Sequence, residues 1–231
     1  DSSYGLNIKM KMLQKVSQLP KTLLLMSSSK FFTEHAQTHF EKPLTEAKIA
    51  YITTAVKGVS DRSYLDRSIQ RMREAGLNFE EIDIEGKKKF ELREILKDKD
   101  IIYVAGGNTF YLLNAARESG FDSLVKELVE RGVLYVGASA GSYIACPTIE
   151  MATWKHQDAY GHYGVDDLNG LNLVPFLVTA HYTPEYESIV REKMKTSRYP
   201  VKILTDEQAL LVVDDDVKLI GEKEIKLDSL S

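Results

Sequence analysis

The chain has 231 residues, of which 43% are hydrophobic, and this is enough for one sizeable α/β core. Its formal net charge of −4 gives no general attraction to nucleic acid or to an anionic membrane, so we expect neither as a partner. The single cysteine, Cys146, excludes an intrachain disulfide, and the sequence has no signal-peptide pattern and no apolar run long enough to span a bilayer. We therefore expect a cytoplasmic protein.

Apolar runs alternate with helical patterns along the chain. We treat residues 1–20 as an N-terminal extension outside the fold and 21–231 as one domain, because no Pro/Gly/Ser-rich linker divides the sequence. Strands are expected, in chain order, at 22–26, 48–53, 79–84, 100–104, 133–136, 177–179 and 209–213. Helices are expected at 61–75, 90–96, 109–119, 121–131 and 185–195, with a charged hairpin at 214–216. This order predicts an α/β fold with a largely parallel sheet and helices on both faces.

The sharpest local motif is GASAG at 137–141, which follows an expected strand and precedes a short helical stretch. A G-x-S-x-G motif in this position is typical of a nucleophile elbow, in which a serine sits on a tight turn between small neighbours. The following helix directs N–H groups toward the charge that develops on a substrate carbonyl. Ser139 is therefore the expected nucleophile; the alternative is a turn of small residues that only packs closely.

A second glycine turn, AGGNT at 105–109, also lies between an expected strand and an expected helix. Adjacent glycines let a backbone N–H approach a ligand, so this turn could supply one oxyanion donor and the N–H of Ala140 the other. The turn lacks the lysine of a phosphate-binding loop and the spacing of a dinucleotide fingerprint. We therefore expect no nucleotide and no other cofactor.

Together these motifs resemble the aspartyl dipeptidase (peptidase E) and cyanophycinase family, which has the class I glutamine amidotransferase-like fold. The likeness covers most of the chain, from the first strand to Val213. It rests on VAGGNTF at 104–110, GASAGS at 137–142, ACPT at 145–148, LNLVPF at 171–176 and TAHY at 179–182.

The resemblance implies a catalytic triad in the chain order serine, histidine, acid. The serine is then Ser139 and the base is His181, at the end of the strand 177–179. The acid is expected to be Glu207. Its neighbour Asp206 is an alternative, because adjacent residues face apart and only one of the two can point inward, and Glu150 is a third candidate.

The resemblance also assigns the oxyanion donors and suggests where substrate binds. Gly107 and Ala140 would supply the N–H groups, and we assign Asn108 and Arg191 to substrate binding. Peptidase E selects an amino-terminal aspartate with an arginine a little beyond the histidine, within an insertion. Here the stretch 183–187 is short and acidic, and Arg191 is the first arginine after it. The sequence therefore departs from the family pattern in the part that selects the substrate.

No metal site is expected. His35 and His39 have the i, i+4 spacing that can place two ligands on one helix face. The intervening residues lack the glutamate of an H-E-x-x-H motif, and no third ligand is evident. A solvated helix face accounts for the pair.

The sequence thus predicts a serine peptidase that hydrolyses small peptides, including amino-terminal aspartyl peptides, through an acyl-enzyme. Its expected partner is a small peptide substrate, and a homo-oligomer is left open. Two alternatives stand beside this one. The first is a binding or regulatory relative that keeps the fold without turnover, and the second is an esterase for small acyl esters.

Overall fold

The structure is a computed structural model that describes residues 19–40, 42–155 and 161–227. Residues 1–18 of the expected N-terminal extension lie outside the described residues. No helix in the described ranges has both the length and the apolar character needed to cross a membrane.

A seven-stranded sheet forms the centre of the fold, in the order β3-β2-β4-β5-β1-β8-β9. The five strands from β3 to β1 run parallel, and β8 and β9 add an antiparallel hairpin next to β1. This confirms the expected, largely parallel sheet. The strands are β1 (Thr22–Met26), β2 (Lys48–Ile52), β3 (Asn78–Ile82), β4 (Ile101–Val104), β5 (Leu134–Ala138), β8 (Gln208–Val213) and β9 (Asp216–Gly221).

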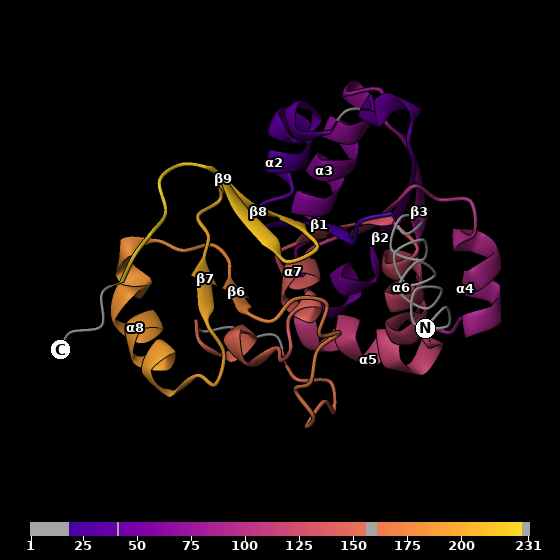
Figure 1. Ribbon diagram of the computed structural model, residues 1–231. Coiled ribbons are helices and arrows are strands. Elements are labelled where there is room, and N and C mark those ends of the chain that lie inside the picture. The colour runs from indigo at the N-terminus through magenta and orange to yellow at the C-terminus, as the bar shows by residue number, and fades with distance from the viewer. Residues whose placement is uncertain (1–18, 41, 156–160, 228–231) are drawn as a thin grey trace, which may run out of the picture.

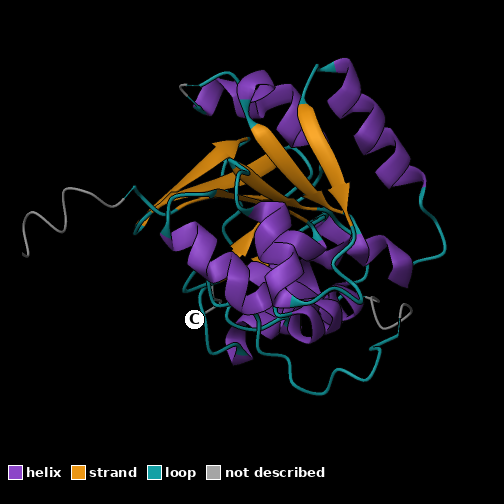
Figure 2. Cartoon of the chain, turned by 90° about the vertical axis from the view of Figure 1, so that its right-hand side faces the viewer, coloured by secondary structure: helices purple, strands orange, loops and turns teal. Residues whose placement is uncertain are grey.

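Helices cover both faces of this sheet (Figures 1 and 2). On one face lie α2 (Lys30–His35) and α3 (Ser63–Glu74). On the other lie α4 (Lys89–Leu96), α5 (Thr109–Ser119), α6 (Phe121–Glu130) and α7 (Ala140–Ala145). Because side chains alternate along a strand, Leu24 and Met26 of β1 pack in the α2–α3 core, whereas Leu23 and Leu25 pack in the opposite core. The central strands therefore read as continuous apolar runs.

A smaller parallel pair of strands stands beside the main sheet. It consists of β6 (Leu177–Thr179) and β7 (Val201–Ile203), joined through α8 (Glu187–Thr196), and it lies to the left of the main sheet in Figure 1. Residues 177–179 form the expected strand, but their partner is β7 and not a strand of the central sheet. Leu177 and Val178 are nevertheless fully buried in the same core as α5, α6 and α7. This packing places the end of β6 close to the end of β5.

Candidate active site

Ser139 occupies a strained turn between β5 and α7. Its backbone angles are φ 50° and ψ −109°, a conformation that a residue with a side chain seldom adopts. The neighbouring glycines leave room for this turn: a Cβ on Gly141 would lie 2.2 Å from the Val104 oxygen, and a Cβ on Gly137 would lie 2.6 Å from the Gly141 oxygen. The turn therefore has the geometry of a nucleophile elbow.

A buried hydroxyl ties the elbow to the neighbouring strand. The Ser142 hydroxyl lies 2.7 Å from the carbonyl oxygen of Met26 in β1 and 2.8 Å from that of Gly137 in β5. Tyr135 adds a hydrogen bond from its hydroxyl to the Gly141 oxygen, at 2.7 Å. These bonds satisfy backbone oxygens at the end of the sheet and hold the turn in place.

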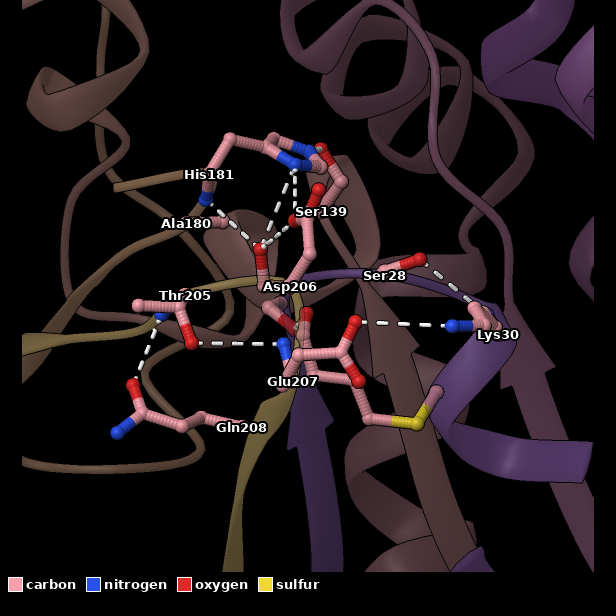
Figure 3. Close-up of polar contacts among 12 residues, drawn as sticks. Ser28, Lys30, Ser139, Ala180, His181, Thr205, Asp206, Glu207 and Gln208 are labelled. Carbon is pink, nitrogen blue, oxygen red and sulfur yellow. Dashed lines mark hydrogen bonds and ion pairs between the residues drawn. The ribbon is translucent and has the colours of Figure 1, made fainter. Parts of the chain in front are cut away.

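His181 reaches Ser139 from the far end of β6. The imidazole Nε2 lies 2.9 Å from Ser139 Oγ, and Nδ1 lies 2.6 Å from Asp206 Oδ1 (Figure 3). With Nδ1–H donating to the carboxylate, Nε2 is left to accept the proton of the serine hydroxyl. His181 itself has a positive φ of 54°, so its backbone is also held in an unusual conformation.

The carboxylate that contacts the histidine belongs to Asp206, so the expected assignment of Glu207 is wrong in this structure. Glu207 points the other way and lies 3.6 Å from Lys30 Nζ (Figure 3). The cause is local: the two residues share the turn before β8, and their side chains leave it on opposite sides. The third candidate, Glu150, begins the short 3-10 helix Glu150–Thr153 and makes no hydrogen bond to His181 in the described part of the chain.

Sequence reasoning missed Ser27, the residue that follows β1. Its hydroxyl donates to Asp206 Oδ1 at 2.6 Å and accepts the backbone N–H of His181 at 2.7 Å. The Ser27 residue is fully buried. A signal for it existed, because Ser27 stands at the carboxyl end of β1, the neighbour of β5, where α/β sheets collect their functional groups.

The contacts of Asp206 stabilise its ionised form. The hydrogen bond from His181 is the main cause that lowers the pKa of the Asp206 carboxyl below its usual value, against the opposing effect of partial burial. The Ser27 hydroxyl and the nearby Lys155 ammonium act in the same direction as His181. Asp206 can therefore orient the imidazole and compensate a positive charge on it at neutral pH.

Two backbone N–H groups remain available beside the serine. The amides of Gly107 and Ala140 donate to no acceptor within the described residues, and both belong to turns that meet at Ser139. Gly107 has a φ of 144°, and a Cβ there would lie 2.4 Å from the backbone of Ala55. Only glycine fits this position. The assignment of these two N–H groups as oxyanion donors stays a prediction.

The two residues assigned to substrate binding have different surroundings. Asn108 lines the cavity at Ser139, but its side-chain oxygen caps α5 by accepting the Tyr111 N–H at 2.9 Å. Arg191 lies on α8 and pairs with Glu187 at 2.6 Å, and it is not among the described residues that line the cavity. Its assignment to substrate binding therefore stays a prediction.

A cavity of about 330 Å³ opens in front of Ser139. Its walls come from β1, α3, the glycine turn before α5, and the elbow. Several of the lining residues carry hydroxyl groups, and no acidic residue lines the cavity within the described part of the chain. The shape accommodates a small polar molecule close to the serine hydroxyl.

One group of possible metal ligands occurs among the described residues. Within the described residues, Glu34, His35 and Glu207 form one group whose ligand atoms lie within 4.8 Å of one another. All three are exposed, and Glu34 and Glu207 already lie 3.5 and 3.6 Å from Lys30 Nζ. His35 and His39, which have the i, i+4 spacing, do not lie on one α-helix, because α2 ends at His35 and a 3-10 helix continues to His39.

The contacts around Ser139 suit one kind of chemistry, in which a serine oxygen activated by an imidazole attacks a carbonyl carbon. This arrangement, on a mostly parallel sheet, defines a serine hydrolase.

Comparison with known proteins identifies the family. The sequence profile of peptidase family S51 matches residues 23–220. An uncharacterized peptidase of Listeria monocytogenes is 34% identical over 191 residues, which cover 78% of this chain and 90% of that one. Peptidase E of a Nostoc species is 29% identical over 226 residues, which cover 90% and 89% of the two chains.

The crystal structure of a candidate peptidase E from Listeria monocytogenes superposes with a TM-score of 0.77 at 30% identity. The match covers 88% of this chain and 100% of that chain. The chain therefore belongs to peptidase family S51 and is a serine peptidase. The resemblance drawn from the sequence motifs is confirmed.

Proposed function

We propose that this serine peptidase hydrolyses small peptides, as a dipeptidase or exopeptidase, through an acyl-enzyme on Ser139. The limited volume of the cavity, about 330 Å³, favours a short substrate over a folded chain. Relatives named peptidase E support the same class, and amino-terminal aspartyl peptides belong among the substrates to be tested. We place the activity in the cytoplasm, which agrees with a single, buried and unpaired cysteine.

In the first step, Ser139 Oγ attacks the carbonyl carbon of the scissile bond while His181 Nε2 accepts the hydroxyl proton. The tetrahedral intermediate collapses when the imidazolium gives this proton to the leaving amine. An ester then joins the acyl group to Ser139. Water, deprotonated by His181, hydrolyses the ester and restores the serine hydroxyl. Asp206 fixes the imidazole tautomer and stabilises the imidazolium during both steps.

The oxyanion that forms in each step would be bound by the N–H groups of Gly107 and Ala140. One such donor typically contributes about 3 to 4 kcal/mol to lowering the barrier. Because both donors belong to the backbone, their position depends on the two glycine turns and not on a side chain. Gly107 has no substitute at its backbone angle, so its turn is as necessary to the proposal as the triad.

The observation that carries the proposal is the chain of contacts from Ser139 Oγ to His181 Nε2, 2.9 Å, and from His181 Nδ1 to Asp206 Oδ1, 2.6 Å. It predicts that a fluorophosphonate probe labels Ser139 and that Ser139→Ala abolishes both labelling and peptide hydrolysis. Equal labelling of the wild-type and Ser139→Ala proteins would show that the nucleophile is a different residue.

A matched pair of variants tests the acid. Asp206→Asn should lower kcat by about 10³- to 10⁴-fold, because the imidazole loses the partner that fixes its tautomer. Glu207→Gln should leave kcat unchanged, because Glu207 contacts Lys30 and not His181. A dipeptide panel that reports free amino acids gives both values. The ratio of kcat/KM for matched ester and amide substrates separates a peptidase from an esterase.

A further inference from the structure

One face of α3 turns polar residues toward the cavity at Ser139. Tyr64, Ser68 and Arg71 are spaced by four and three residues, so they share a face of this helix. Tyr64 and Ser68 line the cavity directly, and the Tyr64 hydroxyl donates to the Gly106 oxygen at 3.2 Å. Arg71 stands one turn further along the same face.

The Arg71 guanidinium is partly buried and is not matched by an acid. Its Nη2 donates to Ser29 Oγ at 3.0 Å, and its buried Nε has no hydrogen-bond partner in the described part of the chain. No described acidic side chain forms an ion pair with it. Arg73, two residues on, is different, because it points away and lies 3.6 Å from Glu81. Partial burial removes water from this charge, and no described anion compensates the loss, so the site would be stabilised by a negative partner.

The groups around Arg71 are also donors. The Tyr51 hydroxyl lies 3.0 Å from Ser68 Oγ, and the fully buried Tyr103 hydroxyl, from the next strand, has no partner among the described residues. The rings of Tyr51 and Tyr103 pack with centroids 4.8 Å apart. The described groups of this cluster are a guanidinium, which only donates hydrogen bonds, and hydroxyls, which can donate one each. None of them is an anion. An anionic acceptor would complete it.

The cluster borders the same cavity as the nucleophile. Ser29, Tyr51 and Ser68 line the cavity together with Ser139 and His181, and none of the described lining residues is acidic. We propose that a carboxylate of the substrate binds at the Ser29–Ser68 wall of this cavity, with Arg71 supplying the positive charge. Arg71 would thereby determine specificity from α3, and not from the segment that follows His181. The proposal rests on the proposed peptidase function and names the residue that selects its substrate.

Matched dipeptides measure this preference. Asp-Leu and Asn-Leu differ by one side-chain carboxylate, and Asn-Leu and its C-terminal amide differ by the terminal carboxylate. We expect the wild-type chain to prefer the carboxylate member of one pair, and Arg71→Met to reduce that preference about 10- to 100-fold, mainly through KM. Arg71→Lys, which keeps the charge but not the planar fork, should retain part of it. The pair that responds identifies which carboxylate binds.

Arg73→Met is the control, because it removes a guanidinium from the same helix outside the cavity; both ratios should stay at wild-type values. If Arg71→Met does not fold, Arg71→Lys and Ser29→Ala still test the wall, and each should lower the same ratio. The proposal is overturned if the wild-type chain shows no carboxylate preference in either pair. It is equally overturned if the folded Arg71 and Ser29 variants keep the wild-type ratios.

Binding to a chain that cannot turn over separates this inference from the proposed function. Calorimetry with Ser139→Ala gives the Kd of Asp-Leu, Asn-Leu and Asn-Leu amide, and adding Arg71→Met should weaken the carboxylate ligand about 10- to 100-fold relative to its neutral partner. If this holds while the wild-type chain hydrolyses nothing, the inference stands and the peptidase proposal fails. If the wild-type chain hydrolyses peptides while Ser139→Ala binds the ligands equally well with and without Arg71→Met, the peptidase proposal stands and this inference fails.

Discussion

Ser27 connects the acid and the base of the site through one hydroxyl. It donates to Asp206 Oδ1 and accepts the N–H of His181, whose φ of 54° places that N–H toward β1. Ser27→Ala should lower kcat about 10- to 100-fold with little change in KM, because the triad loses its alignment and the substrate wall does not change. Steady-state kinetics on the best dipeptide, with the rate of fluorophosphonate labelling, measure the effect.

Ser119→Ala is the control for this prediction. It removes another buried hydroxyl, which donates to the Ala115 oxygen at 2.7 Å within α5. Both variants should lower the free energy of unfolding by about 1 to 2 kcal/mol, and only Ser27→Ala should change kcat. If Ser27→Ala loses stability and keeps the wild-type kcat, Ser27 supports the fold and does not position the triad.

At the residue scale, the sequence predicted the site residues that belong to a recognisable motif. It did not predict the triad acid, whose identity depends on the direction of a side chain. Ser139 could be found because a turn of small residues between a strand and a helix has a recognisable pattern, and His181 because the motif TAHY at 179–182 resembles that of the family. The choice between Asp206 and Glu207 depends on how one turn enters β8, and no local pattern encodes that. Ser27 lies next to Met26, whose oxygen accepts the N–H of Ser139, although Ser27 and Ser139 are 112 positions apart in the sequence. Sequence spacing alone does not show that the two residues are neighbours in space.

The elements of the elbow hold the nucleophile by close contact between backbones. Gly141 has an ordinary φ, but a Cβ there would lie 2.2 Å from the Val104 oxygen, and this backbone atom cannot move away easily. Gly141→Ala should therefore lower the free energy of unfolding by about 1 to 3 kcal/mol. It should also reduce labelling of Ser139, because α7 is displaced from β4. Urea unfolding and probe labelling of the folded fraction measure the two effects.

Gly86→Ala is the comparison for this element. Gly86 has a φ of 73° with nothing within 4 Å of an added Cβ, so alanine there meets backbone strain and no clash. It should lower stability by about 1 kcal/mol and leave labelling unchanged. Wild-type labelling of Gly141→Ala would show that the elbow tolerates a shift of α7 and would contradict the close-contact argument.

The helices and strands could be predicted where their buried residues form a recognisable apolar pattern in the sequence. The strands of the central sheet read as apolar runs because both faces are covered, and both ends of α5 could be predicted from its Asn108 cap and the Gly120 that follows it. The pairing of β6 with β7 could not be predicted, because β7 has three residues with Lys202 in the middle and no recognisable strand pattern. Strand partners are set by the packing of distant segments.

At the scale of the whole molecule, a buried lysine lies between the end of β6 and the segment that leads into α8. Lys155 follows the 3-10 helix Glu150–Thr153, is only 6% exposed, and donates to the carbonyl of Ala180 next to His181. Its ammonium lies 5.2 Å from the centroid of the Tyr186 ring, on the segment that leads into α8. Lys155 thus connects the end of β6, next to His181, to the 3-10 helix Glu150–Thr153 and to Tyr186.

Burial of Lys155 makes the stability of the whole chain depend on pH. Burial lowers the pKa of its ammonium to about 8, and nearby Asp206 opposes this only in part. The folded chain therefore binds fewer protons than the unfolded chain between pH about 8 and the ordinary lysine value of 10.5, and stability contributed by this group rises across that window. Between pH 7.5 and 10, the free energy of unfolding measured in urea should rise for the wild type by on the order of 1 to 3 kcal/mol relative to Lys155→Met.

Lys42→Met, which changes an exposed lysine, is the control, and its free energy of unfolding should depend on pH as that of the wild type does. If the difference between wild type and Lys155→Met is flat over this range, the ammonium is not desolvated, and its contact with Ala180 must form in a hydrated setting.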